Sequence, residues 1–303
     1  MTTPSAGIHH VTAIAGNAAA NRQFYTELLG LRFVKRTVNF DDPGTWHLYY
    51  GDENGRPGTL MTFFPWGDGA TGRRGTRGIT EVAFAVPQEA LGFWSARLAK
   101  HGVKTQEAAG GGMIRFDDPD GIRLALAAVA APDSQGWEGG PVPPDHAIRA
   151  FHSVTFSVRE PDRTGALLQE VFGYTPSESD SSLFLPSGNP AGGAVRLAQD
   201  SGTRSSWGAG TVHHVALRCS GAEEQERVRE AIESRGLRVT PIVDRRYFKS
   251  IYFTEPGGIL LEVATDPPGM AIDEPVDALG ERLMLPTWLE PQRAAIEGNL
   301  PPL

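Results

Sequence analysis

The sequence predicts an α+β protein made of four βαβββ modules that pair into two cupped-sheet domains, and three observations carry this prediction. First, one pattern occurs four times: alternating apolar positions typical of a strand run into an amphipathic helix that ends at a glycine. Second, 20 to 22 residues separate the first strand from that glycine in every copy. Third, the second and fourth copies close with similar strand–turn–strand stretches, FDDPDGIRLALAAV and FTEPGGILLEVATD.

The four copies follow one another along the chain. The first opens with GIHHVTAIAG, and its helix carries Phe24, Leu28 and Leu29 on one face before it ends at Gly30. The other openings and terminating glycines are RGITEVAFAV with Gly102, FHSVTFSV with Gly173, and VHHVALRC with Gly236. Beyond Asp266 the chain has helical fragments and prolines, which predicts a tail that covers a domain or a cleft.

The domain prediction follows from the packing needs of such modules. Each βαβββ module leaves one face of its sheet bare and must bury it against another copy. The stretch AAPDSQGWEGGPVPPDH is rich in proline and glycine and has no periodicity, as expected of a linker. We therefore expect a first pair of modules in residues 1–130, which is metal-free, a linker in 131–147, and a second pair with the tail in 148–303.

Composition narrows the class of protein. The 303 residues carry a net charge of −8, which argues against nucleic acid or an anionic membrane surface as a partner. No apolar run reaches the roughly 20 residues of a membrane span, and no signal peptide is recognised at the N-terminus. With Cys219 as its single cysteine the chain has no internal disulfide, so a cytoplasmic location is expected. A homo-oligomer is compatible with this composition.

One carboxylate lies where the repeat does not require it. Glu262 sits inside the apolar run ILLEVA, and burial of a carboxylate is costly unless it is paired or binds a metal. Counting from the Pro-x-Gly turn, Ala125 occupies the same position in the second copy. On the first strands the matching residues are His10, Glu81, Ser153 and His214. Two imidazoles and one carboxylate, His10, His214 and Glu262, form the set typical of non-haem Fe(II) oxygenases and also suit Mn(II).

Alternatives remain at each of these positions. Adjacent strand residues face opposite sides, so His9 and His213 are the fallback ligands within the two HH pairs. A buried Glu262 could instead form a structural ion pair with Arg245 or Arg246. Four other histidines are interpreted as incidental, namely His47, His101, His146 and His152.

These residues lie in motifs that resemble a known family. GIHHVTAIAG, FHSVTFSV, VHHVAL and DRRYFKSIYFTEPGGILLEVATDPPGM are similar to the vicinal oxygen chelate superfamily of glyoxalase I, bleomycin-resistance proteins and extradiol dioxygenases. The closer resemblance, which covers nearly the whole chain, is to ring-cleaving enzymes of the hydroquinone 1,2-dioxygenase type. It implies Fe(II), or Mn(II), on His10, His214 and Glu262. It also implies that His9, Arg245 and Tyr252 lie next to the metal.

The resemblance leads to a functional expectation. The chain is expected to insert O2 into a hydroquinone- or catechol-type diol, with His9 or Tyr252 transferring protons and Arg245 stabilising developing negative charge. Three aromatic residues near the motifs are expected to line the ring pocket, namely Trp46, Phe248 and Phe253. The alternatives are a glyoxalase-type isomerase, which needs a further carboxylate ligand, and an aromatic-binding protein without catalysis.

Overall fold

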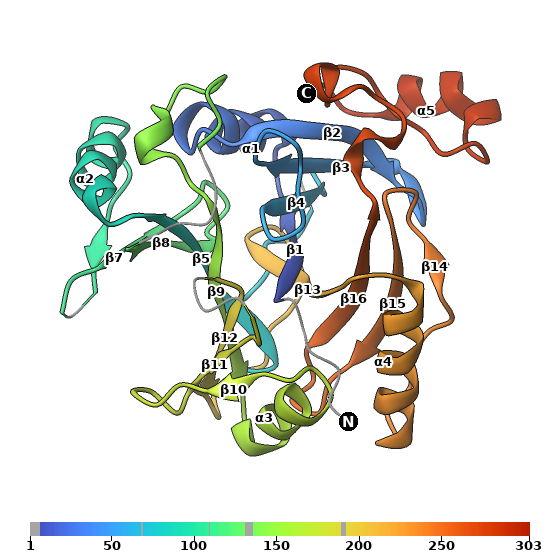
Figure 1. The fold of residues 1–303 in the computed structure, drawn as a ribbon. Coiled ribbons are helices and arrows are strands. Elements are labelled where there is room, and N and C mark those ends of the chain that lie inside the picture. The colour runs from blue at the N-terminus through green and yellow to red at the C-terminus, as the bar shows by residue number, and fades with distance from the viewer. Residues whose placement is uncertain (1–6, 68, 109, 131–135, 189–191) are drawn as a thin grey trace.

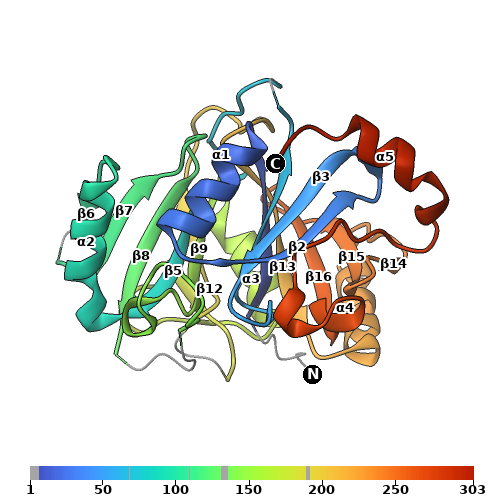
Figure 2. The same cartoon turned by 90° about the horizontal axis from the view of Figure 1, so that it is seen from above.

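The computed structural model describes residues 7–67, 69–108, 110–130, 136–188 and 192–303. Its two eight-stranded sheets lie side by side, with α2 and α4 on the outer sides and α1 and α3 between the sheets (Figures 1 and 2). The strand orders are β14-β15-β16-β13-β1-β4-β3-β2 and β10-β11-β12-β9-β5-β8-β7-β6. The expected α+β class with four βαβββ modules in two cupped sheets is therefore confirmed.

Each module consists of a first strand, a helix and three further strands. The first sheet contains β1 (Ile8–Ala15), β2 (Arg32–Asn39), β3 (Asp42–Gly51), β4 (Leu60–Pro65), β13 (Thr211–Cys219), β14 (Val243–Asp244), β15 (Phe248–Thr254) and β16 (Leu260–Pro268). The second contains β5 (Gly78–Pro87), β6 (Gln106–Glu107), β7 (Met113–Asp117), β8 (Arg123–Val129), β9 (Ala150–Val158), β10 (Thr175–Pro176), β11 (Leu183–Leu185) and β12 (Ala194–Gln199). The helices are α1 (Ala18–Gln23), which continues as a π-helical turn, α2 (Leu91–Lys100), α3 (Pro161–Glu170), α4 (Ala222–Ser234) and α5 (Arg293–Asn299).

The modules pair differently from the expected arrangement. In place of neighbours along the chain, the first module shares a sheet with the fourth, and the second shares a sheet with the third. The contacts are antiparallel pairs of first strands, β1 with β13 and β5 with β9. A repeat shows that the copies are alike, but it does not show which copies bury their faces together. Residues 131–135 of the expected linker lie outside the described residues, and its boundaries stay a prediction.

The pairing of β1 with β13 has a direct consequence for the histidines. Thr12 is opposite His214, and His10 is opposite Ala216, so both histidines lie on one face of one sheet. On its other side β13 pairs with β16, which places Glu262 opposite the same Ala216. Strands from the beginning and the end of the chain thus meet at one point.

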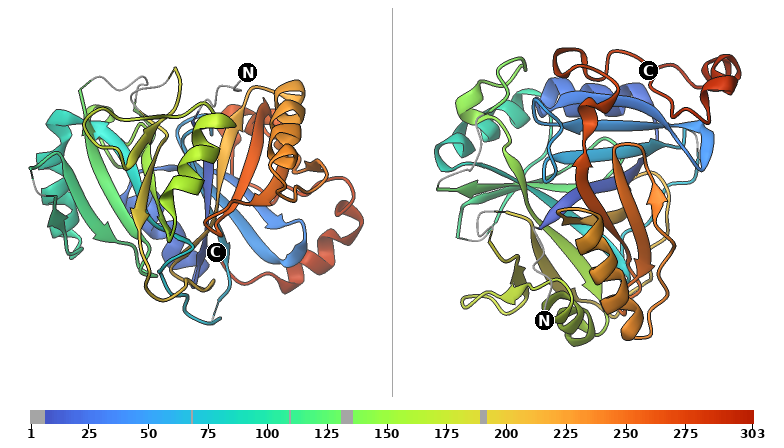
Figure 3. Two further views of the ribbon diagram at one scale, coloured as in Figure 1. Left: turned by 90° about the horizontal axis from the view of Figure 1, so that it is seen from below. Right: turned by 45° about the vertical axis from the view of Figure 1, so that its right-hand side comes forward.

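The C-terminal tail packs on the first sheet. Figure 1 shows it beside β2 and β3, and Figure 3 shows the same tail from two further sides. Lys35 of β2 is fully buried, and its ammonium contacts the carboxylates of Asp273 at 2.7 Å and Glu274 at 2.6 Å. The Trp46 indole N–H donates to the carbonyl of Pro301 at 2.8 Å. Within the described residues, no helix is both long enough and apolar enough for a membrane span.

Candidate metal centre

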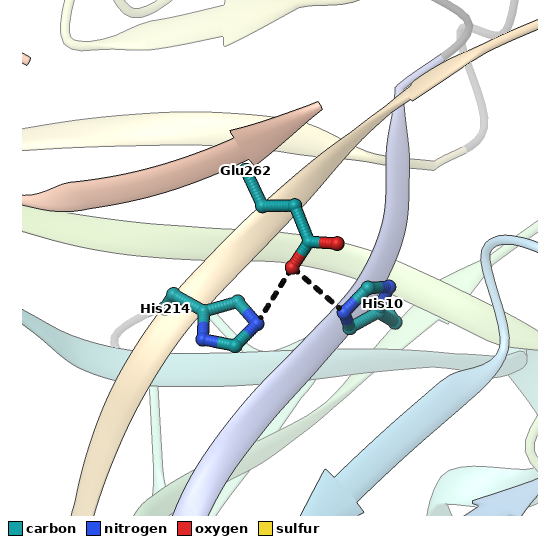
Figure 4. A group of neighbouring side chains, drawn as sticks. All are labelled: His10, His214 and Glu262. Atoms are coloured by element: carbon teal, nitrogen blue, oxygen red, sulfur yellow. Dashed lines mark ion pairs between the residues drawn. The ribbon is translucent and has the colours of Figure 1, made fainter. Parts of the chain in front are cut away.

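Three side chains from three adjacent strands converge in the first sheet (Figure 4). His10 comes from β1, His214 from β13 and Glu262 from β16, and their ligand atoms lie within 4.8 Å of one another. The Oε2 atom of Glu262 is 2.9 Å from His214 Nε2 and 3.3 Å from His10 Nε2. Within the described residues, no other group of three histidine, cysteine or acidic side chains comes together in this way.

The donor atoms fit a divalent cation. His214 Nε2 and Glu262 Oε2 are buried and have no hydrogen-bond partner among the described residues. Burial lowers the pKa of His214, so its imidazole is neutral at neutral pH. Burial alone would raise the pKa of Glu262, but His10 and His214 hold it well below its usual value. A neutral imidazole and a carboxylate are the protonation states that a metal needs, and a metal would satisfy both buried atoms.

Each ligand is held from behind by a second side chain. His10 Nδ1 lies 2.9 Å from Nδ1 of His9, and His214 Nδ1 lies 2.8 Å from Nδ1 of His213. The Ser250 hydroxyl donates to Oε1 of Glu262. These contacts leave the two Nε2 atoms and Oε2 directed at each other. Such support fixes the ring orientation and tautomer of metal-binding histidines.

A cavity of about 300 Å³ opens above the three donors. It is lined by His10, Asn39, Phe40, Asp41, His47, Tyr49, Phe64, Trp66, His213, His214, Arg245, Phe248, Tyr252, Leu260 and Glu262. Its walls are therefore largely aromatic, with a few polar groups, as in sites that bind small ring compounds. The size is at the lower end of the range for ligand pockets.

Tyr252 and Arg245 form a coupled pair at this cavity. Arg245 Nε donates to the Tyr252 hydroxyl at 2.9 Å, and Arg245 Nη1 contacts the Asp41 carboxylate at 2.9 Å. Burial and the nearby Glu262 raise the pKa of Tyr252 well above its usual value. Burial alone would lower the pKa of Arg245, but Tyr252 and Asp41 raise it. At neutral pH the cavity therefore contains a protonated phenol beside a permanent cation.

His9 lies next to the candidate ligand His10, at 2.9 Å between their Nδ1 atoms. It is buried and does not line the cavity, since it lies behind His10 and packs edge-on against Phe248. Of the three aromatic residues expected at the ring pocket, Phe248 lines it, whereas Phe253 belongs to the core and stacks on Phe172. Trp46 lines a separate cavity under the tail.

His47 and His213 are functional candidates that sequence reasoning set aside or ranked second. His47 lines the cavity, with Nδ1 3.0 Å from the Tyr49 hydroxyl and Nε2 3.0 Å from the Thr62 hydroxyl. Burial, with a smaller contribution from His10, lowers its pKa well below the usual value. The HH motif indicated His213 as a candidate, whereas His47 lies in no repeated motif that would have indicated it.

The three remaining histidines lie away from the metal cavity, and the alternative ion pair of Glu262 does not form among the described residues. His146 stacks on Phe93, and His152 Nδ1 lies 3.0 Å from the hydroxyl of Ser153. His101 is exposed. Among the described residues neither Arg245 nor Arg246 forms an ion pair with Glu262, since their carboxylate partners are Asp41 and Asp273.

Comparison with known proteins agrees with this geometry. The family model described as Glyoxalase/Bleomycin resistance protein/Dioxygenase superfamily matches residues 7–126 and 150–263. MhqO of Bacillus subtilis (strain 168), which is named as a ring-cleaving dioxygenase, is 43% identical to this chain. The match covers 100% of this chain and 98% of MhqO. The chlorohydroquinone/hydroquinone 1,2-dioxygenase of Sphingobium indicum is 32% identical over 94% of this chain and 92% of its own.

Solved structures show the same fold. The crystal structure of a protein from Bacillus subtilis subsp. subtilis str. 168, which is named as a dioxygenase, has a TM-score of 0.95 and 42% sequence identity. The match covers 100% of this chain and 98% of that chain. Glyoxalase I from Zea mays is 16% identical and shares the fold alone, with a TM-score of 0.61 over 86% of this chain and 92% of that one. The resemblance recognised in the sequence motifs is thus confirmed: the chain belongs to the glyoxalase, bleomycin-resistance protein and dioxygenase superfamily.

Proposed function

We propose that this chain is a ring-cleaving dioxygenase that uses Fe(II), with Mn(II) as the alternative, on His10, His214 and Glu262. One observation carries the proposal: two imidazole nitrogens and one carboxylate oxygen converge at the floor of an aromatic cavity. Only three protein donors leave coordination positions open, as in non-haem iron oxygenases. When bound, a metal of this kind activates O2 toward an electron-rich phenolate.

The name of the Sphingobium relative supports a hydroquinone-type substrate. In the overall reaction the ring bond next to a hydroxylated carbon breaks, and one oxygen atom of O2 is added to each of the two freed carbons. The hydroxylated carbon becomes a carboxylic acid, and its neighbour becomes an aldehyde if it carried hydrogen. The product is therefore an anion at neutral pH, whereas the diol is neutral.

The walls of the cavity position the ring. Phe40, Phe64 and Phe248 line it and offer apolar faces, while Leu260 closes the side nearest β16. Aromatic rings favour offset or edge-on contacts, which would fix the plane of a bound diol. A ring held in this plane would direct one of its hydroxyl groups toward the three donors.

Tyr252 is assigned the proton transfers at the reacting ring. Its phenol is protonated at neutral pH, and its oxygen accepts from Arg245, so the phenolic hydrogen is free to point into the cavity. Tyr252 therefore acts as a general acid toward oxygen that gains negative charge. Arg245 holds the tyrosine and adds a positive charge at the same place. His9 contacts the ligand His10, not the cavity, so we assign it the orientation of that ligand.

The isomerase alternative requires a further carboxylate ligand. At the positions equivalent to Glu262 the other modules carry Thr62, Ala125 and Arg196, which pair with first-strand residues in the same register. None is a carboxylate, so a ligand set of two histidines and two glutamates is not available among the described residues. His214 Nε2 and Glu262 Oε2, which are buried without a hydrogen-bond partner among the described residues, weigh against a binding protein without a metal.

Anaerobic reconstitution followed by oxygen consumption tests the proposal. The purified chain is loaded with Fe(II) or Mn(II), then mixed with hydroquinone or catechol while O2 and the near-ultraviolet spectrum are recorded. We expect one O2 consumed per hydroquinone, with a new ring-fission absorbance. Turnover of catechol alone would assign an ortho-diol substrate. Retention of one metal per chain without O2 uptake from either diol would refute the dioxygenase proposal.

A further inference from the structure

A second cavity of about 370 Å³ adjoins the metal cavity, and four arginines line it. We call it the arginine pocket, after Arg73, Arg74, Arg77 and Arg204. Its described lining contains no acidic residue, although the chain as a whole has a net charge of −8. Four guanidinium groups around one hollow in an acidic protein are the arrangement that binds carboxylate or phosphate groups.

Two loops that connect the sheets build this pocket. Residues 69–77 lead from the first sheet to the second, and residues 200–210 lead back. The loops pair through bridges between Thr71 and Ala209, Arg73 and Ser206, and Thr76 and Arg204. Because backbone hydrogen bonds join them along this length, the arginines lie on a connected frame.

Two of the guanidinium groups are available for a ligand. Arg73 donates to the backbone carbonyl of Arg204 at 3.0 Å, and Arg74 contacts the Asp117 carboxylate at 3.2 Å. Within the described residues, the guanidinium groups of Arg77 and Arg204 have neither a carboxylate partner nor a hydrogen-bond acceptor. A guanidinium fork offers two parallel donors to a carboxylate.

Arg77 is held in an uncommon conformation that points to a specific role. Its φ is +61°, which is unusual for a residue other than glycine. Its backbone N–H donates to Ser157 at 2.7 Å, and its carbonyl accepts from the Ser205 hydroxyl at 3.0 Å. A Cβ on Gly258 would meet Arg77 Cδ at 3.0 Å, so the arginine lies across the turn that leads to Glu262. Strained residues of this kind are common where a ligand is bound.

Only one layer of side chains separates the arginine pocket from the metal cavity. His213 and Leu260 line both cavities. The imidazole of His213 stacks on the indole of Trp207, with ring centroids 4.3 Å apart, and Trp207 lines the arginine pocket. The aromatic cavity and the cationic pocket thus share a wall that contains His213 and Leu260.

We infer that the arginine pocket is a carboxylate-binding site that receives the acid end of the ring-opened product. The carboxylate site itself follows from the four arginines, whereas its occupant rests on the proposed function. A neutral diol gains nothing from the arginines, but the product carries the new carboxylate and is no longer held in a ring. The pocket would therefore draw the product away from the metal and favour its release.

The first experiment measures binding without turnover. Calorimetry of the metal-free, full-length chain with cis,cis-muconate, a linear dicarboxylate of six carbons, tests the site independently of the metal. We expect saturable binding that weakens with added salt. The Arg77→Gln/Arg204→Gln double variant should bind roughly tenfold more weakly, because two charge-assisted contacts are lost in a partly solvated pocket.

The matched control is Arg159→Gln/Arg227→Gln, which removes the same charge from exposed arginines outside the pocket. It should bind muconate like the unaltered chain. Equal binding by both double variants, or no binding by the unaltered chain, would overturn the site. Because no metal or turnover is involved, failure of the dioxygenase proposal leaves this result intact.

A second experiment distinguishes the two sources of a carboxylate. With metal-loaded enzyme, muconate should inhibit hydroquinone turnover, and Arg77→Gln/Arg204→Gln should relieve that inhibition with an unchanged kcat/KM for hydroquinone. If the variant instead keeps full inhibition, muconate does not act at the pocket and the proposal is overturned. If the variant loses kcat/KM for 2,5-dihydroxybenzoate but not for hydroquinone, the pocket recognises a carboxylated substrate, and its assignment to the product is overturned.

Discussion

Replacement of Glu262 by glutamine removes one negative charge from the centre of the metal site and keeps the shape of the side chain. Oε1 accepts from the Ser250 hydroxyl, so the amide oxygen of the glutamine can keep that bond. The amide NH2 would then point at the Nε2 atoms of His10 and His214, where Oε2 now lies. A donor would face two nitrogens that need their lone pairs for a metal.

The expected loss can be estimated from binding linkage. Substitution of outer partners of metal ligands typically weakens metal binding by about 10- to 100-fold, so removal of a ligand itself should cost at least about 100-fold. At a free metal concentration near 100 times the original Kd, that loss removes about 2–3 kcal/mol of metal-dependent stability. For a chain of this size the metal-induced rise in Tm should shrink by about 5 °C.

A second buried glutamate in the same segment supplies the matched control. Glu255 is 2% exposed and accepts from the Thr164 hydroxyl at 2.7 Å and from the backbone N–H groups of Gly257 and Ile259. Its carboxylate thus holds the turn and contacts no ligand of the metal. Glu255→Gln should lower the Tm of the metal-free protein, since hydrogen bonds to a charged group contribute about 1.5–3 kcal/mol, and leave the metal-induced rise unchanged.

The assay combines metal content by mass spectrometry with thermal unfolding of each variant, with and without metal. We expect Glu262→Gln to lose most of the metal-induced rise in Tm. Glu255→Gln should keep that rise but unfold at a lower temperature. A full complement of metal and an unchanged response in Glu262→Gln would show that this carboxylate is not a ligand. Loss of metal in both variants would mean that the turn, and not Glu262 itself, governs binding.

Three further outcomes are expected from the structure. His9→Ala should retain metal but bind it about 10- to 100-fold more weakly in a chelator competition, because the partner of a ligating imidazole is removed; unchanged affinity would contradict this. Lys35→Met should lower the free energy of unfolding in urea by about 3–5 kcal/mol, since two carboxylates lose their buried cation. Burial, with Glu224, raises the pKa of Cys219 to about 12, so its thiol should react with aromatic disulfides at pH 8 only after unfolding.

The candidate ligands could be predicted because the repeats keep the same register. Ala216 is opposite Glu262 in the fourth module, and Ala83 is opposite Ala125 in the second, so a count from the turn compares equivalent positions. A charged residue that replaces an alanine inside a buried strand then needs a partner. The same comparison could not reveal His47, because a single histidine in β3 has no counterpart that marks it as unusual.

The sequence could not predict which modules share a sheet, and the reason is different. All four first strands have similar apolar alternation, and any two could form an antiparallel pair. The choice is made by long-range packing, such as β1 against β13, which joins residues about 200 positions apart. The contact of His9 could not be predicted either: its position on the strand was predictable, but its contact with His10 depends on the side-chain rotamers of both rings.

The second sheet carries ion pairs at two positions that correspond to the candidate metal ligands of the first. Where the first sheet has His10, the second has Glu81, whose carboxylate contacts Arg115 at 2.6 Å. At the position of Glu262 the third module carries Arg196, which pairs with Asp180. The charged residues at these positions of the second sheet thus have ion-pair partners of their own. The second sheet therefore supports both loops that line the arginine pocket, since residues 69–77 lead to it from the first sheet and residues 200–210 lead back.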